Sequence, residues 1–314
     1  MNVLSEDERV RVLSALVEGN SLSATERMTG VWRKTIARLL RDVGDGCARL
    51  HDGLMRDLRC GVLELDEIWT FVKKKEAHVQ PDDPPEVGDA YTFVALDATA
   101  KLIPAYLVAK RVPEHFKAFA ADLRARVLGA PQLTTDGHKA YIEAIEDAFG
   151  ARVHYAQIIK EYRGDEAGGA SRDDVRYSRG RVKKCLKIVR QGTPDEALVS
   201  TSYVERQNLT LRMGQRRFTR LTNAFSKCLR NLRAAVALYV AHYNLCRVHQ
   251  TLRVTPAMEA GVADHVWSLA ELLSGALTAP TPPPLAPPAR GGSFGRRPTS
   301  TVVLPGQLPL PGVQ

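Results

Sequence analysis

The chain has 314 residues, which is enough for one large domain or two smaller ones. A hydrophobic content of 44% supports a buried core and argues against global disorder. The formal net charge of +9 and the isoelectric point of about 9.4 indicate a polyanionic partner, either nucleic acid or an anionic membrane surface.

The five cysteines are scattered, with no Cys-x-x-Cys pair. Neither a zinc-binding pattern nor a disulfide framework is therefore expected, and a reducing compartment fits best. The polar N-terminal segment MNVLSEDERVRVL does not have the pattern of a signal peptide, and no apolar run approaches the length that spans a bilayer. These features predict a cytoplasmic protein with no membrane partner.

The N-terminal segment is predicted to be helical, since Ser5 and Glu8 resemble a capping box and apolar residues recur at helical spacing. A short helix at 22–28, a glycine turn and a basic helix at 31–43 follow, which is typical of a helix-turn-helix. The last helix of such a unit enters the major groove of DNA. The alternative is a small helical bundle with a solvated basic face. On the first interpretation residues 1–50 form a DNA-binding domain, with contacts from Arg33, Lys34 and Arg38.

The next part of the chain changes to strand-like patterns. Residues 62–72 form an apolar run, and residues 91–97 and 102–109 form two more, which predict an antiparallel hairpin pair. The whole set predicts an α/β fold, a mixed sheet flanked by helices. The later elements are an amphipathic helix at 113–128, a strand at 132–135, a helix at 138–149 and a strand at 152–159.

The C-terminal half differs in composition. Residues 161–200 are polar and basic, and we predict a mobile segment. Helices resume at Tyr203, with a long helix from Asn223 to Asn244. Ten of the 18 prolines lie in the last 35 residues, so residues 274–314 are predicted to form a disordered tail.

Three carboxylates stand out in this basic chain. Asp66 lies within an apolar strand, Asp136 follows the end of a strand, and Glu205 opens a helix whose surroundings are rich in arginine. Carboxylates at the edge of a sheet can hold two divalent ions roughly 3.5–4 Å apart for phosphodiester chemistry. Each acid also fits an ordinary role: Asp66 as a solvated acid on an edge strand, Asp136 as a turn or helix cap, and Glu205 as a counter-ion.

Residues near these acids extend the pattern. Alternation along the first strand places Glu64 and Asp66 on one face and Glu67 on the other. His138 and Lys139 follow Asp136 and either contact a phosphate or lie on the helix surface. A helical stripe that would carry a metal ligand beside phosphate-binding groups, or else form a solvated basic face, contains Glu205, Asn208, Arg212 and Arg216.

At these residues the sequence resembles the DDE transposases of the insertion-sequence-1 family, whose catalytic domain is ribonuclease H-like. The resemblance covers about residues 4–273, and its most specific stretches are TTDGHKAY (134–141) and TSYVERQN (201–208). The other matching stretches are LVEGNSLSATERMTGV (16–31), LDEIWTFV (65–72), VALDATAKLIPAYLV (94–108) and HYNLCRVHQTLRVTPAMEAG (242–261). Some members carry an N-terminal cysteine-based zinc finger, which this chain lacks.

The resemblance implies that Asp66, Asp136 and Glu205 are the catalytic and metal-binding acids of a ribonuclease H-like domain at 58–273. It implies two Mg²⁺ ions, or Mn²⁺ in their place. The implied reaction is hydrolysis at transposon ends, followed by attack of the freed 3′-hydroxyl on target DNA. The partners are then double-stranded DNA and at least one further copy of the chain, in the bacterial nucleoid and without a small-molecule substrate. Further DNA contacts are expected from Lys139, Arg206, Arg212, Arg216 and Arg217.

Two other functions fit parts of the pattern. A non-catalytic helix-turn-helix regulator would bind DNA but would have no need of the three acids. A structure-specific nuclease on the same fold, such as a junction resolvase, would cut DNA without joining strands. Tyr203 also suggests a tyrosine recombinase, but its neighbourhood lacks the spread of Arg and His residues that such sites need.

Overall fold

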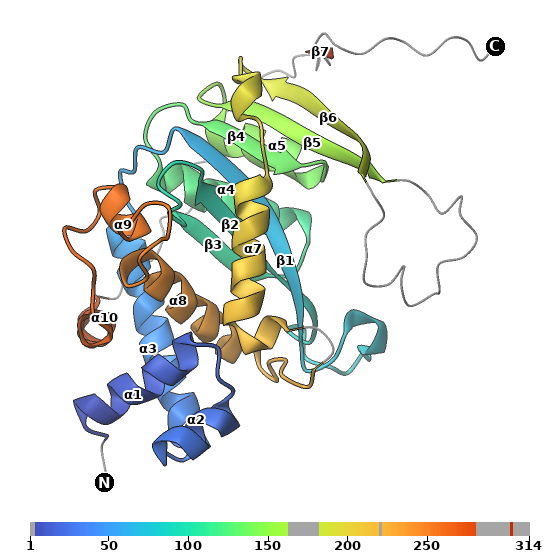
Figure 1. Cartoon of the computed structure of the whole chain (residues 1–314). Helices are drawn as coiled ribbons and strands as arrows, with labels where there is room; N and C mark the ends of the chain where they lie inside the picture. Colours follow the sequence, from blue (N-terminus) through green and yellow to red (C-terminus); the bar gives the residue numbers. More distant parts are fainter. Residues whose placement is uncertain (1–3, 163–181, 220–221, 281–301, 304–314) are drawn as a thin grey trace.

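A computed structural model of the chain describes residues 4–162, 182–219, 222–280 and 302–303 (Figure 1). Its centre is one mixed sheet with the strand order β3-β2-β1-β4-β5-β6-β7. The strands are β1 Val62–Val72, β2 Gly88–Asp97, β3 Ala105–Ala109, β4 Gln132–Asp136, β5 His154–Tyr162, β6 Val182–Gln191 and β7 Val302–Val303.

Helices lie on both faces of this sheet (Figure 1). The α-helices are α1 Glu6–Val17, α2 Leu22–Thr29, α3 Arg33–Leu54, α4 Pro113–Arg126, α5 Ala140–Phe149, α7 Ser202–Gly214, α8 Leu229–Leu245, α9 Pro256–Glu259 and α10 Leu269–Thr278. The short 3₁₀ helices are η1 Glu76–His78, η2 Glu196–Leu198 and η3 Arg216–Phe218. No helix in the described part of the chain is long and apolar enough to cross a membrane.

The strand directions confirm the predicted antiparallel pairing of the second and third strands and the predicted mixed sheet. β1, β2 and β3 form an antiparallel meander, whereas β4 and β5 run parallel to β1. β6 returns antiparallel to β5. A mixed sheet in this order with helices on both faces confirms the predicted α/β class.

Side-chain alternation along β1 separates the two layers of the core. Leu63 and Leu65 are fully buried in the apolar cluster that includes Phe116 of α4. Ile68 belongs to a second apolar cluster, which Val204 of α7 shares. Because consecutive residues of a strand point to opposite faces, the even-numbered positions of β1 face α7 and α8.

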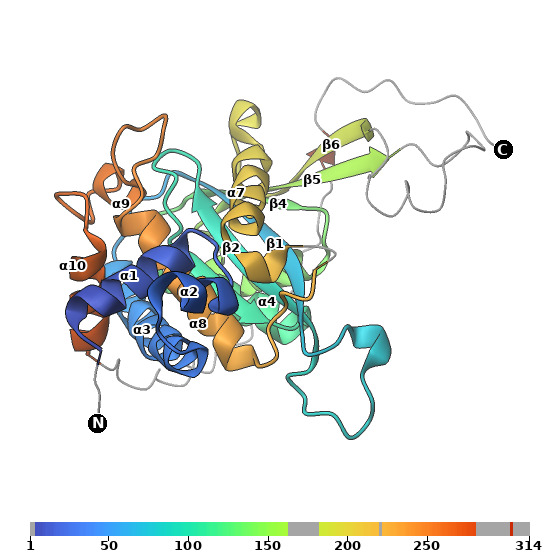
Figure 2. The same cartoon turned by 60° about the horizontal axis from the view of Figure 1, so that its bottom comes forward.

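The N-terminal helices pack onto the rest of the protein. α1 and α2 lie against α3, and α3 runs beside α8 and α10 (Figure 2). A Cβ atom on Gly44 would lie 2.4 Å from the backbone oxygen of Ala234, and one on Gly46 would lie 2.1 Å from that of Ala276. These glycines therefore let α3 contact α8 and α10 backbone to backbone. α3 continues to Leu54, beyond the end predicted at residue 43.

Three further predicted boundaries differ from the structure. Residues 182–191, inside the segment predicted to be mobile, form the strand β6, while residues 163–181 lie outside the described residues. α8 begins at Leu229 rather than Asn223, because the segment before it leaves the helical path and forms an isolated bridge from Ser226 to β1. α10 continues to Thr278, past the predicted start of the tail, and most of that tail is outside the described residues.

Candidate metal and nucleic-acid site

A step in the sheet lies where β4 ends beside β1. The two strands pair in parallel only as far as Leu65 and Thr135. β1 then continues for seven further residues to Val72, whereas β4 ends at Asp136. Asp66 and Glu67 are the first two positions of β1 beyond this pairing. Their side chains point to opposite faces of β1. Beside these two residues β1 is no longer paired with β4, so β4 does not lie between the two side chains there.

Three carboxylates meet at this step. One ligand oxygen from each of Asp66, Glu67 and Asp136 lies within 4.8 Å of the others, and all three residues are half-buried. Within the described ranges, this is the group of acidic, histidine and cysteine side chains close enough to hold a metal ion. The structure therefore brings together two of the three acids predicted from sequence and adds Glu67.

Burial disfavours the ionised forms of Asp66 and Glu67. Burial, together with the nearby charges of Asp136 and Glu205, raises the pKa of Asp66 to about 6. Burial also raises the pKa of Glu67 to about 7, against the opposing charge of Arg111. A bound cation would favour the ionised forms of these groups, because an opposite charge nearby stabilises a carboxylate.

Glu67 forms an ion pair on the face of β1 opposite α7. The Nε atom of Arg111 lies 3.2 Å from Oε1 of Glu67, whose side chain is only 2% exposed. The sequence prediction omitted Glu67 because alternation places it on the other face from Asp66. Glu67 reaches the same site because β1 extends beyond the end of its pairing with β4.

α7 lies along β1 and contacts it at successive points. The buried carboxylate of Glu64 accepts a hydrogen bond of 2.9 Å from the backbone N–H of Val204. One turn further, Nδ2 of Asn208 donates to Oδ2 of Asp66 at 2.9 Å. Glu64 and Asp66 thus face α7 while Glu67 contacts Arg111, so the predicted alternation along β1 is confirmed.

Glu205 lies in the first turn of α7, as predicted. Its Oε1 atom accepts a hydrogen bond of 2.7 Å from the hydroxyl of Thr201 and forms an ion pair with Lys160 of β5. The Glu205 side chain is 46% exposed. Its charge contributes to the raised pKa of Asp66, so Glu205 acts electrostatically on the three-carboxylate cluster from the neighbouring helix.

The segment after β4 is anchored by Asp136 and His138. The backbone N–H of His138 donates to Oδ1 of Asp136 at 3.0 Å. The His138 ring stacks on Phe116 at 4.7 Å with an interplanar angle of 7°. Burial lowers the pKa of His138, and the charge of Arg111 lowers it further. Lys139, the next residue, is exposed.

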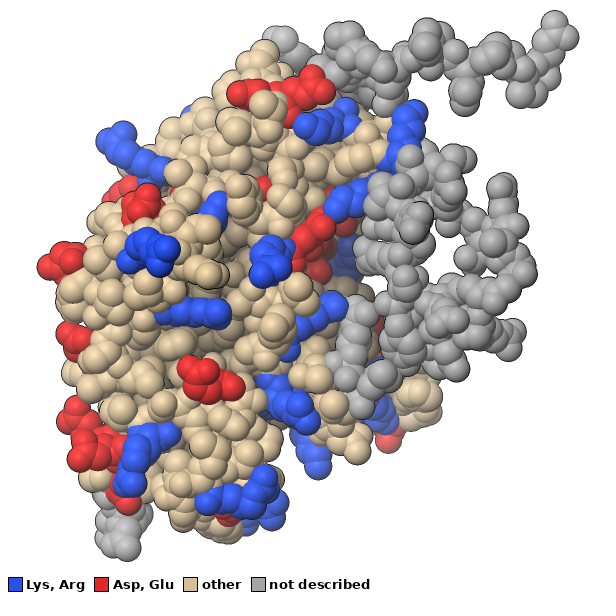
Figure 3. All heavy atoms as spheres, viewed as in Figure 1, with Lys and Arg blue, Asp and Glu red and all other residues tan. Residues whose placement is uncertain are grey.

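The predicted cationic residues near the site occupy different environments. Arg206 and Arg216 are exposed and Arg212 is half-buried. Arg217 donates from Nη1 to the hydroxyl of Ser226 at 2.8 Å, and burial lowers its pKa. Arg216 lies in η3, beyond the end of α7 at Gly214, so the predicted helical stripe stops at Arg212. Lys and Arg atoms flank acidic atoms beside the position of α7 (Figure 3).

The other predicted DNA-contacting residues lie in the N-terminal helices. Arg33, Lys34 and Arg38 are exposed on the first two turns of α3. Val31, Ile36 and Leu40 are buried. The buried residues hold this end of α3 against the protein, while its cationic side chains face solvent.

The donor set at the step suits a hard divalent cation. Carboxylate and amide oxygens are the ligands that Mg²⁺ and Mn²⁺ accept. Asn208 is buried, and its Oδ1 atom has no hydrogen-bond partner among the described residues. A buried amide oxygen without a donor is costly. This oxygen belongs to the side chain that already contacts Asp66, so the residues present fit a divalent ion.

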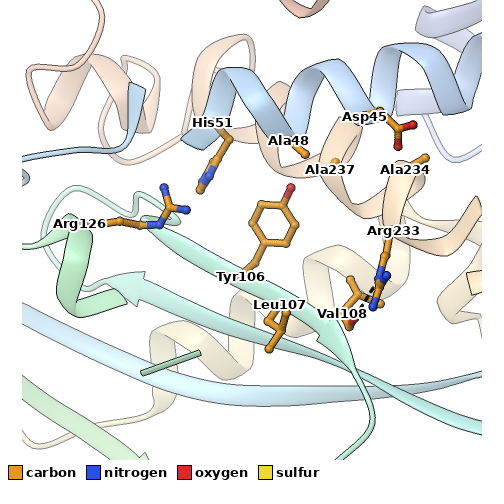
Figure 4. A pocket seen from close by; sticks show the side chains of 11 residues that line it. Asp45, Ala48, His51, Tyr106, Leu107, Val108, Arg126, Arg233, Ala234 and Ala237 are labelled. Atoms are coloured by element: carbon orange, nitrogen blue, oxygen red, sulfur yellow. Dashed lines mark hydrogen bonds between the residues drawn. The ribbon is translucent and has the colours of Figure 1, made fainter. Parts of the chain in front are cut away.

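A separate cavity of about 310 Å³ lies between α3, β3 and α8 (Figure 4). Its charged groups have partners within the chain. Arg126 is paired with Asp52 and Asp122, and Nε of Arg233 donates to the carbonyl of Val108 at 3.3 Å. The cavity does not contain the clustered carboxylates.

No protein-family model and no curated protein matches the chain. Among solved structures, it is similar to a piggyBac transposase synaptic complex with hairpin DNA. That match has 12% identity and a TM-score of 0.34, and it covers 88% of this chain and 71% of the other. The Mos1 strand transfer complex matches at 15% identity and a TM-score of 0.19, with 47% of this chain and 56% of the other covered. A pre-cleavage Mos1 transpososome matches at 13% identity and a TM-score of 0.19, over 49% and 60%.

Proposed function

We propose that this chain is a metal-dependent DNA transposase of the DDE type, as the resemblance to the insertion-sequence-1 family implies. The observation that carries the proposal is the cluster of Asp66, Glu67 and Asp136 at the step in the sheet, with ligand oxygens within 4.8 Å of one another. A regulator that only binds DNA has no use for buried acids held this closely.

In this proposal Asp66 and Asp136 hold two Mg²⁺ ions, or Mn²⁺ in their place, and Glu205 completes the second site. The ions supply charge neutralisation on the phosphate and an activated water or 3′-hydroxyl. Asn208 orients Asp66 through its hydrogen bond, and Thr201 with Lys160 holds the Glu205 carboxylate.

The cationic residues around the site contact the DNA backbone in this proposal. Positive side chains beside an acidic centre attract the phosphates that the centre must cut and join. Arg33, Lys34 and Arg38 of α3 bind the transposon end through the helix-turn-helix, and joining two ends requires at least two copies of the chain. The contacts near the acidic centre come from Lys139, Arg206, Arg212, Arg216 and Arg217.

Strand transfer tests this proposal. A labelled duplex with the DNA sequence that flanks this reading frame is incubated with supercoiled target DNA and Mg²⁺ or Mn²⁺. We expect the wild-type chain to nick the duplex and join its 3′ end to the target. Asp136→Asn should abolish both steps. Glu143→Gln is the matched control, because Glu143 is an acid on α5 that pairs with Lys117 at the surface.

The outcomes separate the candidate functions. Undiminished joining by Asp136→Asn would overturn the catalytic assignment. Metal-dependent cutting without joining would instead favour the nuclease. Specific binding to the duplex with no cutting in either metal, by a folded wild-type chain, would favour the regulator.

A further inference from the structure

An apolar and cationic patch is exposed where α2 ends and α3 begins. Trp32 is 56% exposed and Met28 is 64% exposed. Arg27, Arg33 and Lys34 beside them are exposed as well. Large apolar side chains that are this exposed and are rimmed by charged residues mark interaction surfaces more often than the rest of a protein surface does.

The local backbone keeps this patch facing outward. Gly30 ends α2 in the left-handed conformation with φ of 72°, and Val31 is buried. The backbone N–H of Arg33 donates to Oε1 of Glu26 at 3.1 Å, so the turn between the helices is fixed. Trp32 is the residue just before α3, and its ring lies 4.8 Å from the ammonium group of Lys34.

The charge and shape of the patch favour duplex DNA as its occupant. Exposed cations surround the indole ring, which suits a polyanion. The apolar part consists of two side chains, Met28 near the end of α2 and Trp32 just before α3, whereas the later turns of α3 are packed on α8 and α10 and cannot lie on a membrane. In a helix-turn-helix, the first residues of the second helix contact base edges in the major groove.

We propose that Trp32, supported by Met28, reads duplex DNA through apolar contact with thymine methyl groups in the major groove. The inference rests on the proposed transposase function and deepens it, since Trp32 would set the sequence preference while Arg33 and Lys34 contact phosphates. The thymine methyl is the apolar group that the major groove presents.

Binding of duplexes by the full chain in EDTA tests the inference. The probe is a 20-bp duplex selected by the wild-type chain from a randomised pool, measured by fluorescence anisotropy over a range of salt concentrations. We expect Trp32→Ala to weaken binding about 5- to 100-fold, the range for loss of one good base contact. The salt slope should stay unchanged, because no phosphate contact is lost, whereas Lys34→Ala should reduce the slope by about 1.

A uracil-substituted copy of the same duplex isolates the methyl groups. The wild-type chain should bind this uracil duplex more weakly than the thymine duplex. Trp32→Ala should bind the two duplexes equally. Trp32→Phe, which keeps a ring, should fall between the wild type and Trp32→Ala. Leu277→Ala, at a 46% exposed apolar residue of α10, is the matched control and should bind like the wild type.

Three results would overturn the inference. The first is wild-type affinity for the duplex in Trp32→Ala, and the second is an equal loss of affinity for the thymine and uracil duplexes in that variant. The third is Trp32-dependent binding of the chain to phosphatidylglycerol vesicles that is tighter than its binding to the duplex. None of these involves the carboxylates. Strand transfer by Trp32→Ala at saturating protein therefore shows separately whether the proposed catalytic function stands.

Discussion

The buried carboxylate of Glu64 on β1 accepts a hydrogen bond from the backbone N–H of Val204 in the first turn of α7, at 2.9 Å. No side chain of the helix's own N-cap makes such a bond. A helix N-terminus stabilises a negative charge, and a buried carboxylate is costly without a donor. This pair therefore fixes where α7 lies on β1, and with it the positions of Glu205 and Asn208.

Replacing Glu64 should loosen the start of α7. In Glu64→Leu the acceptor for Val204 is lost, so amide hydrogen exchange in the first turn of α7 should speed up about five- to tenfold, as expected for loss of about 1 kcal/mol. Exchange in β1 should stay slow. Glu64→Gln keeps an acceptor oxygen and should show a smaller change. Equal exchange rates in the wild type and Glu64→Leu would show that the bond does not hold the helix.

The metal-free protein should lose stability as the pH rises. Burial raises the pKa of Asp66 to about 6 and that of Glu67 to about 7, so between about pH 4 and 7 the folded chain binds more protons at these groups than the unfolded chain. By linkage, their contribution to the free energy of unfolding is present below about pH 4 and is lost as the pH rises to 7.

The measurement compares urea unfolding of the wild type and Asp66→Asn, in EDTA, from pH 4.5 to 8. Asp66→Asn cannot ionise and should gain stability relative to the wild type as the pH rises, by about 1–3 kcal/mol. Saturating Mn²⁺ should reduce that difference, because it stabilises the wild-type carboxylates. A difference that does not change with pH would contradict the raised pKa of Asp66.

The sequence supported the prediction of the central sheet because its strands carry their own pattern. β1, β2 and β3 carry apolar, strand-like runs, and the short connection between β2 and β3 favours their antiparallel pairing. Asp66 and Asp136 could be singled out as acids in or at the end of such strands. Glu67 could not be placed, because its approach depends on β4 ending one residue beyond its last pairing with β1, which is a tertiary property.

Other differences have similar causes. Residues 182–191 read as mobile because they carry many charges, but Leu186 and Ile188 alternate with Lys187 and the segment pairs with β5. Gly44 and Gly46 favour a helix end when only local propensity is considered. The structure continues α3 through them, because α8 and α10 approach too closely for larger residues.

Removing Arg111 should expose the cost of burying Glu67. Arg111→Met leaves the Glu67 carboxylate, 2% exposed, without its cation, so its pKa should rise further. We expect a loss of about 1–3 kcal/mol of unfolding free energy at pH 8 and a smaller loss at pH 5.5, where Glu67 is protonated. Lys117→Met, which breaks an exposed pair with Glu143, should cost about 0–1 kcal/mol at both pH values. Equal losses at the two pH values in Arg111→Met would mean that packing of the Arg111 stem, not the charge on Glu67, sets the cost.

The contact between α3 and α8 gives a prediction with its control in the same helix. A Cβ atom at Gly44 would lie 2.4 Å from the backbone oxygen and 2.5 Å from the Cα atom of Ala234, so Gly44→Ala forces the two helices apart. We expect it to cost about 1–3 kcal/mol, the usual range for overpacking a core. A Cβ at Gly53 meets nothing within 4 Å, so Gly53→Ala should stabilise α3 by up to about 1 kcal/mol through helix propensity alone. Urea unfolding of both variants measures the difference. Residues of α8 belong to the apolar cluster that Val204 of α7 shares, so a displacement of α8 that reaches α7 should also weaken Mn²⁺ binding by Gly44→Ala. A loss of stability without any change in Mn²⁺ affinity would show that the carboxylate site does not depend on the α3–α8 contact.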